Sequence, residues 1–219
     1  MNLISPNLNS LHKVRNSLQS LPHQLYWNIS AEIGKFFLDF VIQTNIKNIL
    51  EFGTSNGYSG LWFAEGIATT QGHLWTVESH DGRYTQAVDN FLEAGVTNFV
   101  TQIKGHAPEI LDNFPEVTNL DLIFLDATKS EYPSYLQRIL PLLSQKGVVV
   151  ADNIASHWDR HTKFIEDASS LNKYIAHYWP DLGSGMIFIV PEQNYETTIN
   201  LIDSLTQKKG QRLDKNKDA

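Results

Sequence analysis

Three oxygen-bearing side chains follow two apolar runs of the sequence, at positions where a metal ion could bind. Asp126 comes directly after residues 122–125, and Asp152 and Asn153 come directly after residues 148–151. Carboxylate and amide oxygens are hard donors of the kind that Mg²⁺ prefers, with Ca²⁺ or Mn²⁺ as alternatives. We therefore expect Asp126, Asp152 and Asn153 to form a divalent-metal site that leaves coordination positions open for water or a substrate.

A lysine close to this group could act as a base. Lys129 comes three residues after Asp126 and could face the same pocket. A divalent cation disfavours an ammonium beside it, so more of the lysine would be present as the neutral amine, which could act as a general base near neutral pH. The alternative for this residue is a solvated surface lysine. We predict that Lys129 is catalytic.

A glycine-rich turn follows an earlier apolar run, Ile49 to Phe52. Gly53, Gly57 and Gly60 allow the backbone to turn sharply and to approach a ligand closely, and the N-terminus of the next helix would favour an anionic group. Their spacing differs from the Gly-x-Gly-x-x-Gly pattern that accommodates a pyrophosphate, which argues against NAD. The turn predicts a nucleotide-like ligand.

The next apolar run, Leu74 to Val77, ends in Glu78. In nucleotide-binding α/β folds an acid at this position accepts hydrogen bonds from ribose hydroxyls. Glu78 therefore indicates an adenosyl ligand.

Apolar strand-like runs alternate with helical patterns, which predicts an α/β fold with a doubly wound, mostly parallel sheet of seven strands, helices on both faces and an antiparallel last strand. The expected strands are 49–52, 74–77, 99–103, 121–125, 148–151, 174–178 and 186–190. The expected helices are 9–21, 30–44, 57–68, 82–94, 107–113, 132–143, 162–170 and 195–205, followed by a frayed tail over 207–219.

The chain of 219 residues predicts one domain: N-terminal helices or a lid over 1–45, a cofactor-binding core over 46–190 and a C-terminal extension over 191–219. The net charge of −7 argues against binding to nucleic acid. The absence of cysteine excludes disulfides, zinc–thiolate sites and cysteine nucleophiles. With no long apolar run and no signal-peptide pattern, we expect a cytoplasmic protein that does not enter a membrane.

Four motifs together resemble the class I S-adenosylmethionine (SAM)-dependent O-methyltransferases, and most closely the cation-dependent catechol and caffeoyl-CoA type. The motifs are residues 51–59, Val77-Glu78, residues 125–129 with Tyr132, and residues 150–153, and the resemblance covers roughly 30–190. It implies a Rossmann-like methyltransferase fold that binds SAM, a small-molecule hydroxyl acceptor and a homodimeric assembly.

The resemblance also implies roles for individual residues. Gly53 and Ser59 would hold the methionine part of SAM, Glu78 the ribose, and His106 with Ala107 would lie by the adenine. The full set expected to bind the cofactor is Glu51, Gly53, Ser55, Gly57, Ser59, Glu78, His106, Ala107 and Asp126. Asp126, Asp152 and Asn153 would bind the metal, and Lys129 would take the proton from the acceptor. The sequence departs from the family at His106, where an acid is common, at Thr128, and in the longer tail after Val190.

We therefore predict a metal-assisted O-methyltransferase for a catechol-like or vicinal-hydroxyl acceptor. The alternatives are an NAD-dependent oxidoreductase and a non-catalytic protein that binds an adenosyl ligand on the same fold. His157 and His161 could share a helix face and bind a metal, although we prefer a surface or lid role for them. Trp158 could line the acceptor pocket, whereas we expect Tyr132 and Tyr135 to be packing residues.

Overall fold

The computed structural model describes residues 6–22, 26–112 and 117–214, which fall into two compact units. The first unit comprises residues 1–106 and the second residues 107–219. Asn113 and residues 215–219, which end two of the predicted segments, lie outside the described residues. The organisation into a single domain with a lid, a core and an extension stays a prediction.

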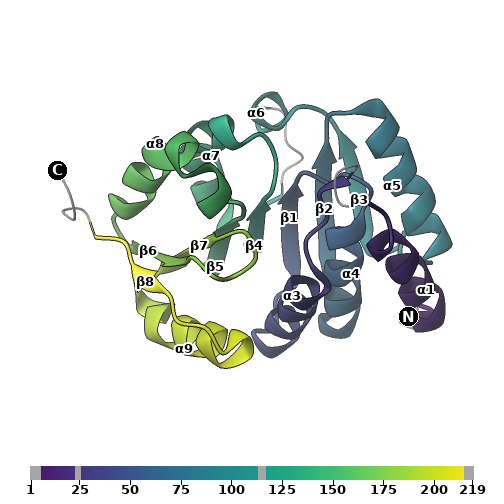
Figure 1. Ribbon diagram of the computed structural model, residues 1–219, viewed down its shortest axis with the longest axis horizontal. Coiled ribbons are helices and arrows are strands. Elements are labelled where there is room, and N and C mark those ends of the chain that lie inside the picture. Colours follow the sequence, from purple (N-terminus) through teal and green to yellow (C-terminus); the bar gives the residue numbers. More distant parts are fainter. Residues whose placement is uncertain (1–5, 23–25, 113–116, 215–219) are drawn as a thin grey trace. The chain divides into compact units, whose positions relative to one another are not determined.

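The described residues of the first unit form three parallel strands in the order β3-β2-β1, shown in Figure 1. They are β1 (Asn48–Phe52), β2 (His73–Glu78) and β3 (Val100–Lys104). Phe52 lies opposite Val77, so β1 and β2 end at the same level. The turn that follows β1 and the acid that ends β2 are therefore neighbours.

Among its described residues, the first unit has four helices that pack against these strands or against one another. They are α1 (Leu8–Gln19), α3 (Ala31–Gln43), α4 (Tyr58–Thr70) and α5 (Asp81–Glu93). Helix α4 packs against β1 and β2, α5 packs against β2 and β3, and α3 packs against α4. Ser30 caps α3, because its hydroxyl accepts a hydrogen bond from the Ile33 N–H at 3.2 Å.

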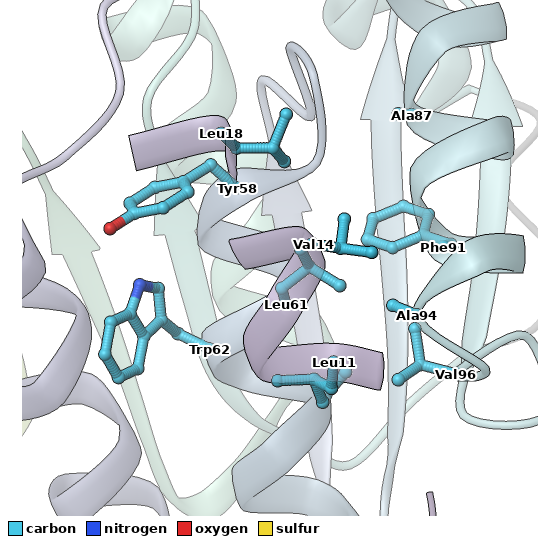
Figure 2. Packing of buried hydrophobic residues seen from close by; sticks show 11 residues of the cluster. Leu11, Val14, Leu18, Tyr58, Leu61, Trp62, Ala87, Phe91, Ala94 and Val96 are labelled. Carbon is cyan, nitrogen blue, oxygen red and sulfur yellow. The ribbon is translucent and has the colours of Figure 1, made fainter. Parts of the chain in front are cut away.

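The apolar face of α1 is buried within the first unit. Leu11, Val14 and Leu18 recur at helical spacing and pack into a cluster with side chains of α4 and α5, which include Trp62 and Phe91 (Figure 2). The guanidinium of Arg15 also lies over the Trp62 ring, 3.5 Å from its centroid. This packing accounts for the apolar pattern of the N-terminal helix.

In the described part of the second unit there are five strands, in the order β4-β5-β7-β6-β8. They are β4 (Leu120–Leu125), β5 (Leu143–Ala151), β6 (Tyr174–Trp179), β7 (Met186–Pro191) and β8 (Gln211–Arg212). Strands β4 and β5 are parallel, whereas β7 is antiparallel to both β5 and β6, and β8 is antiparallel to β6. The parallel strands therefore give way to antiparallel ones toward the end of the chain.

The helices of the second unit are α6 (Ala107–Ile110), α7 (Tyr132–Ile139), α8 (Trp158–Ser169) and α9 (Tyr195–Thr206). Helix α7 packs against α8, α8 against β6, and α9 against β7. Figure 1 shows α7 and α8 on one side of these strands and α9 on the other. Among the described residues, no helix is both long enough and apolar enough to cross a bilayer.

The predicted α/β class is confirmed, with a mostly parallel sheet surrounded by helices, but the number of strands is wrong. The described residues form eight strands, because Gln211 and Arg212 pair with β6 where we expected a frayed tail. Main-chain hydrogen bonds hold this pairing together, including one from the Leu213 N–H to the Ala176 carbonyl at 2.9 Å. Because such bonds do not depend on apolar side chains, the sequence shows no apolar pattern that would predict the strand.

The boundary between α7 and β5 also differs from the prediction. Helix α7 ends at Ile139 instead of continuing to Leu143, and β5 begins at Leu143 instead of Val148. Pro141 explains the early end, because proline lacks the N–H that would continue the helical hydrogen bonds, and the chain instead passes through the 3₁₀ turn Leu140–Leu142.

Candidate functional site

Two aspartates lie at the ends of adjacent strands in the second unit. Leu125 of β4 lies opposite Ala151 of β5, and Asp126 and Asp152 are the residues that directly follow them. The Asp152 N–H donates to the Leu125 carbonyl at 3.0 Å, and its carboxylate accepts the Asn153 N–H at 2.6 Å. The side chain of Asp152 is buried, while Asn153 has a left-handed φ of 64°, which asparagine tolerates.

The charge of one aspartate acts on the other. Burial, and then the negative charge of Asp126, raise the pKa of Asp152 to about 7, while the N–H groups of Asn153 and Ser184 and the ammonium of Lys129 act in the opposite direction. A cation held near both carboxylates would relieve this repulsion. Proteins commonly hold Mg²⁺ through only one or two carboxylates, with water completing its shell.

The donor chemistry of Asp126, Asp152 and Asn153 therefore fits a hydrated divalent cation. In the part of the chain that the structure describes, no group of three His, Cys, Asp or Glu residues could hold a metal ion. Any metal would depend on the amide of Asn153 and on water beside the two carboxylates. The divalent cation stays a prediction.

Lys129 lies in the 3₁₀ turn Lys129–Glu131, between β4 and α7. Its Nζ donates to Oδ1 of Asp126 at 2.6 Å and to the hydroxyl of Tyr132 at 3.1 Å. Its side chain is only 14% exposed, so the alternative of a solvated surface lysine is wrong. The turn thus brings Lys129 and Asp126 together as the sequence predicted, while its catalytic role stays a prediction.

Tyr132 is buried, as we expected of a packing residue, but it also contacts polar groups. Its hydroxyl donates to the Leu125 carbonyl at 2.8 Å and accepts from Lys129. Burial, and then the charges of Asp126 and Asp152, raise the pKa of Tyr132 well above its usual value, so the hydroxyl stays protonated. The sequence reasoning missed this contact, for which the spacing of three residues after Lys129 was the available signal.

His161 is fully buried, so the surface role that we preferred for it is wrong. Neither of its ring nitrogens has a hydrogen-bond partner among the described residues, and the ring packs 5.1 Å from the ring of Tyr132. Burial, followed by the charges of Lys129 and His157, lowers the pKa of His161 to about 4. The imidazole is therefore neutral near pH 7.

His157 and Trp158 occupy different environments from that of His161. His157 precedes α8 as its cap residue and is not buried, whereas His161 lies within the helix and is buried. Trp158 is 42% exposed, and its ring lies 5.3 Å from that of Tyr178. The predicted role of Trp158 in an acceptor pocket stays a prediction.

In the first unit, the glycine-rich turn after β1 is held against β2. The N–H groups of Gly53 and Thr54 both donate to the Val77 carbonyl, at 3.0 and 3.1 Å. Gly57 has a φ of +87°, and a Cβ at Gly57 or Gly60 would lie 3.0 or 2.8 Å from Phe91. Packing of α4 against α5 is therefore sufficient to require these two glycines, and their contact with a cofactor stays a prediction.

Glu78 is fixed by backbone groups on either side of it. Its Oε2 accepts the Ser55 N–H and its Oε1 accepts the His80 N–H, each at 2.8 Å. A carboxylate oxygen has two lone pairs, so each oxygen can accept one further hydrogen bond. This arrangement suits the predicted role of Glu78 as an acceptor for ribose hydroxyls, which stays a prediction.

Glu51 lies at the centre of a buried hydrogen-bond network. Its carboxylate accepts hydrogen bonds from the hydroxyl of Ser59 at 2.5 Å and from the hydroxyl of Thr76 at 2.6 Å. The hydroxyl of Thr54 lies 2.6 Å from the hydroxyl of Thr76. The network joins the turn to β2 and fixes its conformation. Sequence reasoning missed Thr76, whose signal was a hydroxyl between the apolar residues Trp75 and Val77.

The two residues predicted to contact adenine are neighbours in the sequence and belong to different units. His106 is exposed and ends the first unit, whereas Ala107 is buried and begins α6 of the second. Their role stays a prediction, as do the direct contacts of Glu51, Ser55 and Ser59 with the cofactor.

Comparison with known proteins places these features in a family. A sequence model described as O-methyltransferase matches residues 5–179. The chain is 34% identical over 128 residues to a catechol O-methyltransferase of Mycobacterium tuberculosis, across 58% of this chain and 56% of that protein. It is 29% identical over 174 residues to a caffeoyl-CoA O-methyltransferase of Medicago sativa, across 76% and 69% of the two chains.

Solved structures agree with these sequence relatives. The O-methyltransferase TomG of Streptomyces achromogenes, whose crystal structure is a complex with SAM, superposes with a TM-score of 0.70 at 26% identity. The match covers 83% of this chain and 89% of TomG. The matched region nevertheless spans little more than half of the Mycobacterium tuberculosis relative. Because the family model matches most of the sequence, the chain belongs to the O-methyltransferase family.

Proposed function

We propose that this protein is a SAM-dependent O-methyltransferase. It transfers a methyl group to a hydroxyl of a small, catechol-like or vicinal-hydroxyl acceptor, with the assistance of a divalent cation. Family membership and the relatives that are named catechol and caffeoyl-CoA O-methyltransferases support the reaction and the acceptor class. The complex of TomG with SAM supports the cofactor.

In this proposal, the strand ends of the first unit bind SAM. Glu78 accepts hydrogen bonds from the ribose hydroxyls, because two N–H groups fix its carboxylate and each oxygen still has a lone pair available. The glycine-rich turn, held in shape by the network around Glu51, receives the methionine part.

The strand ends of the second unit act on the acceptor. The observation that carries the proposal is the position of the Lys129 ammonium, which Asp126 and Tyr132 hold at the end of β4 near the buried Asp152. Lys129, as the neutral amine, takes the hydroxyl proton, the acceptor oxygen bonds to the methyl carbon, and the bond from that carbon to sulfur breaks, which leaves a neutral thioether. A divalent cation held by Asp126, Asp152 and Asn153 would favour the deprotonated acceptor.

The two alternatives have less support. An NAD-dependent oxidoreductase would need a pyrophosphate-binding turn, which the spacing of Gly53, Gly57 and Gly60 does not provide. A non-catalytic protein would not need Lys129 to be held by the carboxylate of Asp126 and the hydroxyl of Tyr132. A homodimer is the assembly that we expect, and it awaits measurement of the mass in solution.

Calorimetry with SAM, its demethylated product S-adenosylhomocysteine and NAD tests the cofactor. We expect the first two to bind and NAD to give no heat of binding. Binding of NAD alone would contradict the proposal and favour the oxidoreductase.

Titration with Mg²⁺ and with Mn²⁺ tests the metal site without depending on activity. We expect Asp152→Ala to abolish binding of both ions and to lower methyl transfer to catechol. Asp121→Ala is the matched control, because Asp121 is a buried aspartate near the other end of β4. Methyl transfer that survives both a chelator and Asp152→Ala unchanged would show that no metal takes part.

Lys129→Ala tests the base. We expect it to leave the affinity for S-adenosylhomocysteine nearly unchanged and to lower kcat by roughly 100-fold or more, the usual contribution of a positioned base. Equal losses in affinity and in kcat would show that Lys129 has a structural role instead.

A further inference from the structure

The hydroxyl of Tyr132 lies between a main-chain carbonyl and the ammonium of Lys129. It is 2.8 Å from the Leu125 oxygen and 3.1 Å from Nζ of Lys129. A tyrosine hydroxyl has one hydrogen, and the Leu125 carbonyl can only accept it. Tyr132 must therefore accept from Lys129 through an oxygen lone pair, which fixes the direction of both hydrogen bonds.

These contacts limit the orientations that Lys129 can adopt. Its nitrogen has three directions available besides the bond to Cε, and Asp126 and Tyr132 occupy two of them. Among the described residues, Lys129 has no third hydrogen-bond partner. In the neutral amine, two N–H groups point to Asp126 and Tyr132, so the lone pair points in the remaining direction.

Tyr132 is itself rigidly held. Its side chain is fully buried, and its ring packs 5.1 Å from that of His161 and 5.5 Å from that of Phe164. Its hydroxyl donates a hydrogen bond to the carbonyl of Leu125, the last residue of β4. A lysine has a flexible four-carbon stem, and this contact connects its free end to the strand.

We propose that Tyr132 is a positioning residue, whose hydroxyl sets the direction in which Lys129 receives the proton of the acceptor. This inference rests on the proposed function of Lys129 as the base. The proton moves from the acceptor oxygen to Nζ, while that oxygen displaces the thioether from the methyl carbon. Tyr132 keeps its own proton throughout, because it remains the donor to the Leu125 carbonyl.

Tyr132→Phe removes the hydroxyl and preserves the ring packing. We expect kcat to fall about tenfold, which corresponds to ~1.4 kcal/mol and to the loss of one hydrogen bond to a charged group. We expect the KM for SAM to stay unchanged. Tyr135→Phe is the matched control, because Tyr135 is a buried tyrosine of the same helix whose hydroxyl donates to Glu131. Its kcat should stay within about twofold of the wild type.

A double-mutant cycle shows whether Tyr132 acts through Lys129. In the Lys129→Ala background we expect Tyr132→Phe to change kcat by less than about twofold. Multiplicative losses in the double variant would overturn the proposal, because they would indicate a role independent of Lys129.

Nuclear magnetic resonance of the Lys129 ammonium separates this inference from the proposed function. We expect slow exchange of its protons with water in the wild type and in Tyr135→Phe, and fast exchange in Tyr132→Phe. If the wild type methylates no hydroxyl, the proposed function fails while the exchange rates still decide the positioning. Exchange that is equally slow in Tyr132→Phe would overturn the positioning role even if the enzyme is active.

Discussion

Replacement of His161 by leucine tests whether a buried, unpaired imidazole lowers the stability of the second unit. Both ring nitrogens lack a partner among the described residues. An unsatisfied buried polar group costs about 1–3 kcal/mol, whereas an apolar side chain of similar size carries no such cost. Near pH 8 we therefore expect His161→Leu to be as stable as the wild type, or more stable by ~1 kcal/mol.

The effect of pH on this comparison follows from the lowered pKa. His161 has a pKa of about 4 in the folded protein, against 6.5 for an unperturbed histidine. The unfolded chain then binds the proton more readily, so the wild type loses stability as the pH falls from 6.5 toward 4. The full loss is ~3 kcal/mol, and ~2 kcal/mol of it develops between about pH 8 and pH 5.

Other groups near His161 also titrate or carry charge. Tyr132, Lys129 and His157 face it, and the last two contribute to its lowered pKa. Asp152 has the opposite effect on the pH dependence of stability, because its pKa is raised to about 7 in the folded protein. Between pH 3.8 and 7 the folded protein keeps a proton on Asp152 that the unfolded chain has lost. The contribution of Asp152 to stability therefore decreases as the pH rises through this range. The wild type and His161→Leu share that contribution, so the difference between them isolates His161.

Urea unfolding of both proteins, followed by tryptophan fluorescence between about pH 5 and pH 8, measures this difference. We expect the gain of His161→Leu over the wild type to increase by ~2 kcal/mol at the acidic end. His157→Leu is the control, because His157 is not buried and should keep most of the pH dependence. Parallel curves for the wild type and His161→Leu would refute the reasoning.

Two further substitutions test the packing of the first unit. Glu65→Ala should lower the free energy of unfolding by ~2–3 kcal/mol, because it leaves the buried guanidinium of Arg15 without its carboxylate. The control Glu93→Ala breaks the exposed ion pair with Lys13 and should lower the free energy by less than ~0.5 kcal/mol in the same urea titration. Equal losses for the two variants would contradict this assignment. Gly57→Ala should cost at least ~1–2 kcal/mol, because Gly57 has a φ of +87° and its new Cβ would lie 3.0 Å from Phe91; an unchanged midpoint of thermal unfolding would be inconsistent with that strain.

The sequence predicted those parts of the fold that periodic burial determines. The core strands of both units are mostly apolar, as in β1 and β4, and such strands occur where a sheet is buried on both faces. Strand β8 could not be predicted, because only main-chain hydrogen bonds define it. The start of β5 was also missed, since Gln145 and Lys146 interrupt the apolar pattern of that strand.

Those parts of the candidate site could be predicted that depend on residue type and on short spacings in the sequence. The pairing of Lys129 with Asp126 follows from their spacing of three residues in the short connection between β4 and the 3₁₀ turn. The burial of His161 did not follow, because the sequence around it is polar and only the packing of α8 on α7 turns this side chain inward. The hydrogen bond of Thr76 to Glu51 joins two strands, and a sequence pattern carries no information about such distant partners.

Strand β8 lies on the edge of β6, beyond residues 5–179 that match the family. An uncovered strand edge presents unpaired N–H and C=O groups to any other chain that can adopt an extended conformation. The C-terminal segment therefore shields this protein from edge-to-edge association with its own copies. A fusion partner should be attached at the N-terminus, since a bulky group close behind Arg212 would compete with this shielding.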